Sequence, residues 1–200
     1  MNYSLFSSSQ VDCQTLSPSH KSNDWINNVL PLSQCSTYQD PMLLNQLFEA
    51  SRFNFYQVNQ AIDPILSAQR RCQRTSLYIQ CITVEQRLLL ATNLNPNQDI
   101  QVLSGAANWL IGNSPNCAIA VQHQAVSRCH AVLGYATDLG FYITDVGSEA
   151  GTYVNRRLLG ALQRRSLRDG DLIELGHLRI EFLIDRIGQP VEPNEDETRH

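Results

Sequence analysis

Short apolar runs separated by turn residues fill the second half of the chain and constrain its fold more than any other feature. Gly, Asn, Asp and Ser lie between the runs, a spacing typical of strands in a sandwich or barrel. In the last run, Leu178, Ile180, Phe182 and Ile184 alternate with charged residues, although Leu183 interrupts the alternation. We therefore predict a mainly β domain. The runs are Leu77–Ile82, Leu88–Leu90, Trp109–Ile111, Ala118–Val121, Ala131–Tyr135, Phe141–Thr144, Tyr153–Val154, Leu172–Leu175 and Leu178–Ile184.

The first half of the chain has a different character. Its N-terminal part is rich in Ser, Gln and Asn and has too little apolar sequence to offset the entropy of ordering. Asp40-Pro41 and Asp63-Pro64 each place a capping residue before a proline, and each predicts the start of a helix. The expected order is a flexible polar tail over 1–39, a short helical region over 40–74, a connector over 75–84, the sandwich over 85–185 and an acidic disordered tail over 186–200.

Composition and motifs argue against several classes of function. The formal net charge of -4, with a single lysine, disfavours a broad nucleic-acid interface. Six scattered cysteines form no C-x-x-C pair, so they predict neither a zinc site nor a redox motif. No apolar stretch approaches the length that spans a bilayer, and no signal-peptide pattern opens the chain. We therefore expect a cytoplasmic, non-catalytic protein with no cofactor, no metal and no membrane partner.

Four different sequence blocks follow one another along the predicted sandwich. They are Ile111-Gly112, Val126–Ala131, Asp145–Ser148 with Gly151–Asn155, and Leu167–Gly176 with its Asp169-Gly170-Asp171 turn. Together they resemble a forkhead-associated (FHA) domain over about residues 85 to 185. The resemblance implies a sandwich of two largely antiparallel sheets, with a phosphothreonine site in the loops at one end.

The resemblance also assigns candidate ligand residues. Ser127 matches the family serine that holds phosphate, and Arg128 is an additional cation beside it. Asn113 stands where the family has an arginine, and Ala150 where it has an asparagine that holds the peptide backbone. Both departures remove strong hydrogen-bonding groups. The remaining matches in the predicted phosphopeptide-binding site are Thr152, which helps shape the pocket, and Asn155 in the following turn.

Other residues are expected to shape or assist the site. His130 resembles the family histidine that ties the binding loop together, and Gly112 and Gly151 suit backbone turns in the same loops. Arg156 and Arg157 are possible auxiliary cations, although the pattern fits solvated surface residues equally well.

Two functional hypotheses remain open. In the first, the chain is a protein–protein interaction adaptor that binds a phosphothreonine-containing protein through Ser127 and Arg128. In the second, it is a phosphate-independent scaffold or assembly subunit that binds an unmodified protein, which the substitutions at Asn113 and Ala150 favour. Fold alone does not choose between them.

Overall fold

The computed structural model describes residues 43, 45–47, 54–85, 87–95, 97 and 99–187. The predicted polar tail over 1–39 and most of the predicted acidic tail lie outside these residues. The described elements are α2 (Phe55–Arg71), β1 (Tyr78–Val84), β2 (Arg87–Thr92), β3 (Gln101–Ser104), β4 (Asn108–Gly112), β5 (Ile119–Ala120), β6 (Ala131–Ala136), β7 (Gly140–Asp145), β8 (Thr152–Val154), β9 (Arg157–Leu158), β10 (Arg164–Ser166), β11 (Asp171–Leu175) and β12 (Leu178–Ile187).

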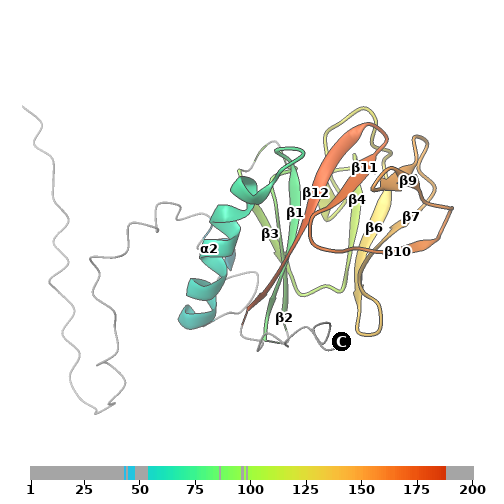
Figure 1. The fold of residues 1–200 in the computed structure, drawn as a ribbon. Coiled ribbons are helices and arrows are strands. Elements are labelled where there is room, and N and C mark those ends of the chain that lie inside the picture. Colours follow the sequence, from blue (N-terminus) through green and yellow to red (C-terminus); the bar gives the residue numbers. More distant parts are fainter. Residues whose placement is uncertain are drawn as a thin grey trace, which may run out of the picture. The chain divides into compact units, whose positions relative to one another are not determined.

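The strands form two sheets that pack face to face (Figure 1). One sheet has seven strands in the order β3-β2-β1-β12-β11-β8-β9, and the other has five in the order β10-β7-β6-β4-β5. Neighbouring strands are antiparallel except for the parallel pairs β1 with β12 and β4 with β5. The predicted mainly β sandwich of two largely antiparallel sheets is therefore confirmed.

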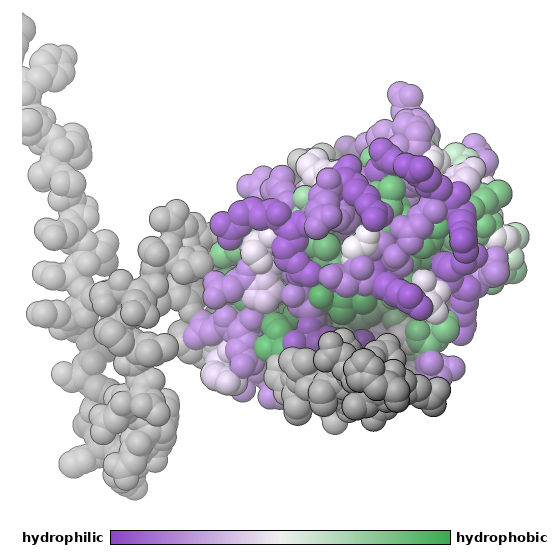
Figure 2. All heavy atoms as spheres, viewed as in Figure 1, coloured by the Kyte–Doolittle hydropathy of each residue, from purple (hydrophilic) through white to green (hydrophobic). Residues whose placement is uncertain are grey.

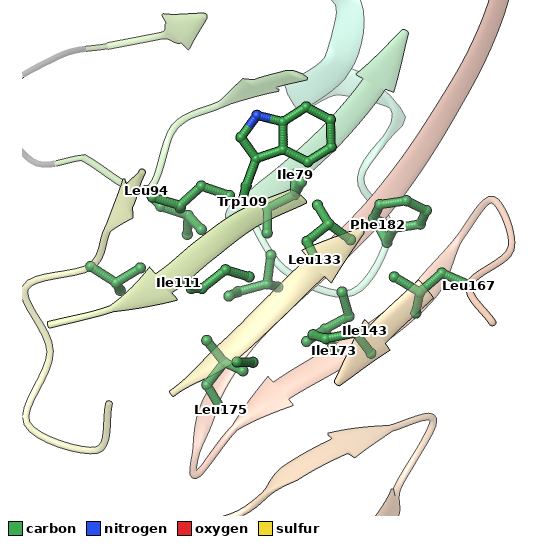
Figure 3. Packing of buried hydrophobic residues seen from close by; sticks show 14 of the residues in the cluster. Ile79, Leu94, Trp109, Ile111, Leu133, Ile143, Leu167, Ile173, Leu175 and Phe182 are labelled. Atoms are coloured by element: carbon green, nitrogen blue, oxygen red, sulfur yellow. The ribbon is translucent and has the colours of Figure 1, made fainter. Parts of the chain in front are cut away.

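The core between the sheets is apolar. Trp109, Ile111 and Leu133 of the five-stranded sheet pack with Ile173 and Phe182 of the seven-stranded sheet, and all five are buried. Figure 3 shows these side chains filling the space between the strands. Burial of this set stabilises the sandwich and positions the loops at the strand ends.

The sandwich begins earlier than the sequence indicated. Strand β1 lies in the segment 75–84 that we expected to be a connector, and it pairs with β2 on one side and β12 on the other. Every residue of β1 except Thr83 is buried, because the strand is covered on both faces. It therefore lacks the alternation of a half-buried strand, although the apolar run Leu77–Ile82 did indicate a strand.

Helix α2 covers the outer face of the seven-stranded sheet beside β1 (Figure 1). Val58, Ala61 and Ile65 are buried in one apolar cluster with Ile82 of β1 and Leu89 of β2. The predicted helix start at Asp63 is wrong, because the helix begins after the N-cap Asn54 and carries Pro64 inside it. Asn54 and Gln57 form a reciprocal capping box, which satisfies the first free N–H groups.

The end of α2 is tied to β12 by charged groups. Arg71 contacts the carboxylates of Asp185 at 2.5 Å and Asp169 at 3.2 Å. The backbone N–H groups of Gln73 and Arg74 both donate to the buried carboxylate of Glu181, at 2.9 Å each. These bonds fix the segment after the helix against the sandwich. No helix in the described part of the chain is both long and apolar enough to cross a membrane.

Candidate functional site

Several loops meet at one end of the sandwich. The backbone N–H of Asn113, after β4, donates to Ser127 O at 2.9 Å, which joins the β4–β5 and β5–β6 loops. The N–H of Glu149, before β8, donates to Ser127 Oγ at 3.0 Å. The N–H of Gly176, after β11, donates to Gly151 O at 2.9 Å. These bonds bring segments far apart in the sequence around Ser127 and hold them in a fixed arrangement.

The buried ring of His130 connects the loop of Ser127 to the loop of Gly151. Its side chain is buried, with 0% exposure. Nδ1 accepts the backbone N–H of Ser127 at 3.0 Å, so the ring proton is on Nε2, which lies 3.3 Å from Gly151 O and donates to it. Burial lowers the pKa of His130, against the opposing effects of Gly151 O and the Asp145 carboxylate, so the neutral ring is favoured. His130 therefore shapes the loops and does not face a ligand.

Asp145, at the end of β7, organises the loop that leads to β8. Its Oδ1 accepts the backbone N–H groups of Gly147 at 2.8 Å and Ser148 at 2.9 Å. Its Oδ2 accepts the hydroxyls of Ser148 at 2.5 Å and Thr152 at 2.7 Å. Burial by itself raises the pKa of Asp145, but these four hydrogen bonds outweigh it and lower the pKa to about 2. The ionised carboxylate thus fixes the loop that carries Glu149 and Gly151.

Gly112 allows β4 to approach the β5–β6 loop closely. A Cβ at this position would lie 2.2 Å from Arg128 O and 3.0 Å from Cys117 Sγ. No side chain fits there without movement of the backbone. The absence of a Cβ at Gly112 is therefore what lets Ser127 and Arg128 lie beside Asn113.

The structure brings together Asn113, Ser127 and Arg128 from the predicted set. Asn113 and Arg128 are exposed and Ser127 is half-buried. The backbone N–H of Ser127 is already donated to His130, so it is not free for a ligand. The Ser127 hydroxyl accepts the N–H of Glu149 and keeps its own hydrogen to donate. Asn113 Nδ2 donates one hydrogen to His123 O at 3.2 Å and has a second.

Other predicted ligand residues do not join this group. Thr152 has 0% exposure and donates its hydroxyl to Asp145, so it supports the loop from inside and does not contact a ligand. Asn155 lies just beyond the other end of β8 from Gly151, where its side chain binds Asp171 Oδ1 and the N–H of Leu172. Arg156 and Arg157 follow it in the β8–β9 hairpin. The structure therefore separates the two auxiliary arginines and Asn155 from the loops around Ser127.

Two histidines at this end belong to none of the sequence blocks. The ring of His123 lies edge-on to the ring of His177, with centroids 4.8 Å apart. His123 Nδ1 accepts the N–H of Ala125 at 3.2 Å and shapes its own loop. The one sequence signal that could have placed a histidine at this end is the position of His177 directly after the Leu175-Gly176 block. Within the described part of the chain, no group of three or more metal-ligating side chains is present.

A hollow of about 550 Å³ opens beside Asn113. Its lining is largely neutral, with amide side chains contributed by three separate loops. No arginine or lysine of the described chain is among the lining residues, which are Asn95, Asn97, Asn113, Pro115, Ala120, Gln122, His123 and Gln124. The hollow can therefore offer hydrogen bonds from amides, without a fixed positive charge.

The comparison with protein families agrees with this geometry. Residues 109–176 match the family model for the FHA domain. The sandwich is an FHA domain. The match covers the strands from β4 to β11, and with them the loops joined by Ser127, His130 and Asp145.

Two bacterial regulatory proteins are similar to about half of the chain. The glycogen accumulation regulator GarA of Mycobacterium tuberculosis is 34% identical over 95 residues, which is 48% of this chain and 56% of GarA. The oxoglutarate dehydrogenase inhibitor of Corynebacterium glutamicum is also 34% identical over 95 residues, 64% of its length. The chain thus spans between half and two thirds of these relatives.

Solved structures of FHA domains also align with the chain. One, from work on phosphothreonine-dependent FHA domain interactions, is 26% identical and covers 40% of this chain and 79% of its own, with a TM-score of 0.34. The FHA domain of the CT664 protein from Chlamydia trachomatis is 23% identical and covers 46% of this chain and 90% of its own, with a TM-score of 0.36.

Proposed function

We propose that this FHA domain binds a phosphothreonine-containing segment of a partner protein, and that the chain acts as a non-catalytic adaptor. The observation that carries the proposal is the position of the Ser127 hydroxyl. It lies where three loops meet, is oriented by the N–H of Glu149, and has a hydrogen to donate to a phosphate oxygen. The regulator and the inhibitor named above are each 34% identical to this chain over 95 residues, which supports a regulatory binding role.

The neighbouring side chains define how strong this binding can be. Exposed Arg128 supplies a cation next to Ser127, and Asn113 supplies an amide hydrogen. Glu149 is exposed on the adjacent loop and opposes a dianion. The missing charge-assisted hydrogen bond at Asn113 removes about 1.5–3 kcal/mol and the missing neutral one at Ala150 removes about 0.5–1.5 kcal/mol. Together the two substitutions weaken binding by about one to three orders of magnitude. We therefore expect a weak phosphothreonine site that depends on Ser127.

A second candidate function is binding of an unmodified protein at the same loops. The neutral hollow beside Asn113 favours it, because amides from Asn95, Gln122 and Gln124 can bind a peptide backbone or a polar side chain without phosphate. Such a partner would bind equally well before and after phosphatase treatment.

Binding of the full chain to a degenerate phosphothreonine peptide library tests both functions. The unphosphorylated library is run in parallel, and so are the variants Ser127→Ala and Ser166→Ala. Ser166 is an exposed serine in β10, so it controls for loss of a hydroxyl elsewhere on the surface. We expect preference for the phosphorylated library, a loss of about tenfold or more in Ser127→Ala, and no change in Ser166→Ala. Equal binding of both libraries would contradict the phosphothreonine proposal and favour the unmodified partner.

A further inference from the structure

A second hollow, of about 720 Å³, lies away from the Ser127 loops. It is formed where the segment after α2, the β8–β9 turn, the β10–β11 turn and the start of β12 come together. In the face seen in Figure 2, hydrophilic side chains cover most of the surface over β11 and β12. Charged groups dominate the lining, which consists of Arg74, Asn155, Arg156, Asp169, Gly170, Asp171, Leu172 and Arg179.

The two carboxylates of this lining are already engaged within the domain. Asp169 Oδ1 accepts the N–H of Ile184 at 2.7 Å and contacts Arg71 at 3.2 Å. Asp171 accepts Asn155 Nδ2 at 2.8 Å on one oxygen and the N–H of Arg168 at 2.8 Å on the other. Asp169 thus has a cationic partner in Arg71, whereas Asp171 is bound by neutral donors and keeps its negative charge in the lining.

Two of the three arginines that line the hollow have no carboxylate partner in the described part of the chain. Arg179 pairs with Glu174 at 3.4 Å, on the strand beside it. By contrast, the guanidinium groups of Arg74 and Arg156 have no carboxylate partner among the residues that the structure describes. Both residues are exposed, so each can bind an oxyanion from solution.

Arg156 also occupies a strained backbone position. Val154 pairs with Arg157, so Asn155 and Arg156 form a two-residue hairpin turn, with φ of 51° and 66°. A turn with positive φ at both residues strongly favours Asn followed by Gly. Asn155 fits this preference, but Arg156 stands where glycine would relieve the strain. The chain therefore carries a long cationic side chain toward the hollow at a cost in backbone energy, which points to a use for that side chain.

We infer that this hollow is a second binding site, which takes an oxyanion-bearing segment of a partner protein between Arg74 and Arg156. The ligand group is an oxyanion on a peptide, either a phosphate or a cluster of carboxylates. A guanidinium binds both groups through two parallel hydrogen bonds. The site is separate from the Ser127 loops, since Asn155 and Arg156 lie beyond the opposite end of β8. It does not depend on the proposed binding of phosphothreonine.

Anisotropy of a fluorescein-labelled peptide with the full chain tests this site. The peptide contains two phosphoserines and no threonine, and matched peptides carry glutamates or serines at the same positions. We expect Arg156→Gly to weaken binding about tenfold or more and to raise the thermal midpoint, because glycine relieves the turn. Arg74→Ala weakens binding to a similar extent, whereas Arg156→Lys keeps most of the affinity. Preference for the phosphoserine peptide identifies phosphate as the ligand, and equal binding of the glutamate peptide identifies carboxylate clusters.

Two control variants show whether the peptides bind in this hollow or elsewhere on the domain. Arg186→Ala removes an exposed arginine of β12 that does not line the hollow, and it leaves binding unchanged. Ser127→Ala also leaves binding of these peptides unchanged, which distinguishes the hollow from the Ser127 loops. The inference is overturned if Arg74→Ala and Arg156→Gly bind as the wild type does, if Arg186→Ala loses as much affinity as they do, or if no charged peptide binds.

Discussion

Replacement of Asp145 by asparagine is the perturbation that best tests how the loops around Ser127 are held. In the native protein, this carboxylate accepts two backbone N–H groups and the hydroxyls of Ser148 and Thr152. An asparagine keeps one acceptor oxygen but places an NH₂ group opposite the two hydroxyls. The Thr152 hydroxyl is buried, so it loses its acceptor with no water to replace it. Asp145→Asn should therefore destabilise the domain and loosen the β7–β8 loop.

The pKa of Asp145 sets the size and the pH dependence of the effect. Folding lowers this pKa from 3.8 to about 2, and a shift of this size stabilises the folded state by about 2 kcal/mol at neutral pH. The side chain is only 6% exposed, so solvent screening does not reduce this value greatly. Because the folded pKa is depressed, the stabilisation is present above pH 3.8 and is lost as the pH falls toward 2. About 1 kcal/mol should remain at about pH 3.

Urea unfolding of the wild type and Asp145→Asn, measured at about pH 7 and about pH 3, checks this reasoning. We expect a difference of about 2 kcal/mol or more in the free energy of unfolding at neutral pH, and a difference smaller by about 1 kcal/mol at the acidic pH. Asp138→Asn, in the exposed turn between β6 and β7, is the matched control and should be nearly neutral at both values. A difference between wild type and Asp145→Asn that stays constant between the two pH values would refute the assigned role of the ionised carboxylate.

Two further substitutions test the site from opposite directions. Asn113→Arg restores a guanidinium next to Ser127, and we expect it to tighten binding of a phosphothreonine peptide about tenfold in calorimetry without tightening the unphosphorylated form. Gly112→Ala places a Cβ 2.2 Å from Arg128 O, so unfolding experiments should show a loss of about 3 kcal/mol or more, whereas Gly160→Ala, with its nearest contact at 3.4 Å, should change stability little.

The sequence predicted the sandwich because most of its strands carry a recognisable pattern. Strand β12 alternates through Ile180 and Phe182, and turn residues bound the other runs. The sequence did not place β1 inside the sandwich, because α2 covers the outer face of the sheet and removes the alternation from Tyr78–Val84. It also misplaced the helix start, because the helix begins at the local Asn54–Gln57 capping box and continues through the Asp63-Pro64 pair.

The sequence predicted which loops form the candidate site, but not which side chains of those loops lie together. The blocks identified the loops that meet at Ser127, and the hydrogen bonds of His130 join two of these loops. Order along the chain does not say at which end of a strand a residue lies. Three residues of β8 therefore separate Gly151, near Ser127, from Asn155, which binds Asp171 instead. Strand alternation turns the Thr152 side chain inward toward Asp145, so Thr152 can shape the pocket only from inside the loop.

The residues of these loops are of two kinds: some contribute to the stability of the fold, and others can change with little effect on it. His130, Asp145 and Gly112 are coupled to neighbouring loops through buried hydrogen bonds or close backbone contact, so changing any of them leaves a buried group unsatisfied or forces the backbone to move. Asn113 and Ala150 are exposed, and substitution there costs little folding energy. The strength and charge preference of ligand binding can therefore change at these two positions while the loop framework stays folded. Measuring stability and affinity together on Asn113→Arg and Asp145→Asn separates the two constraints, because the first should change affinity alone and the second should change both.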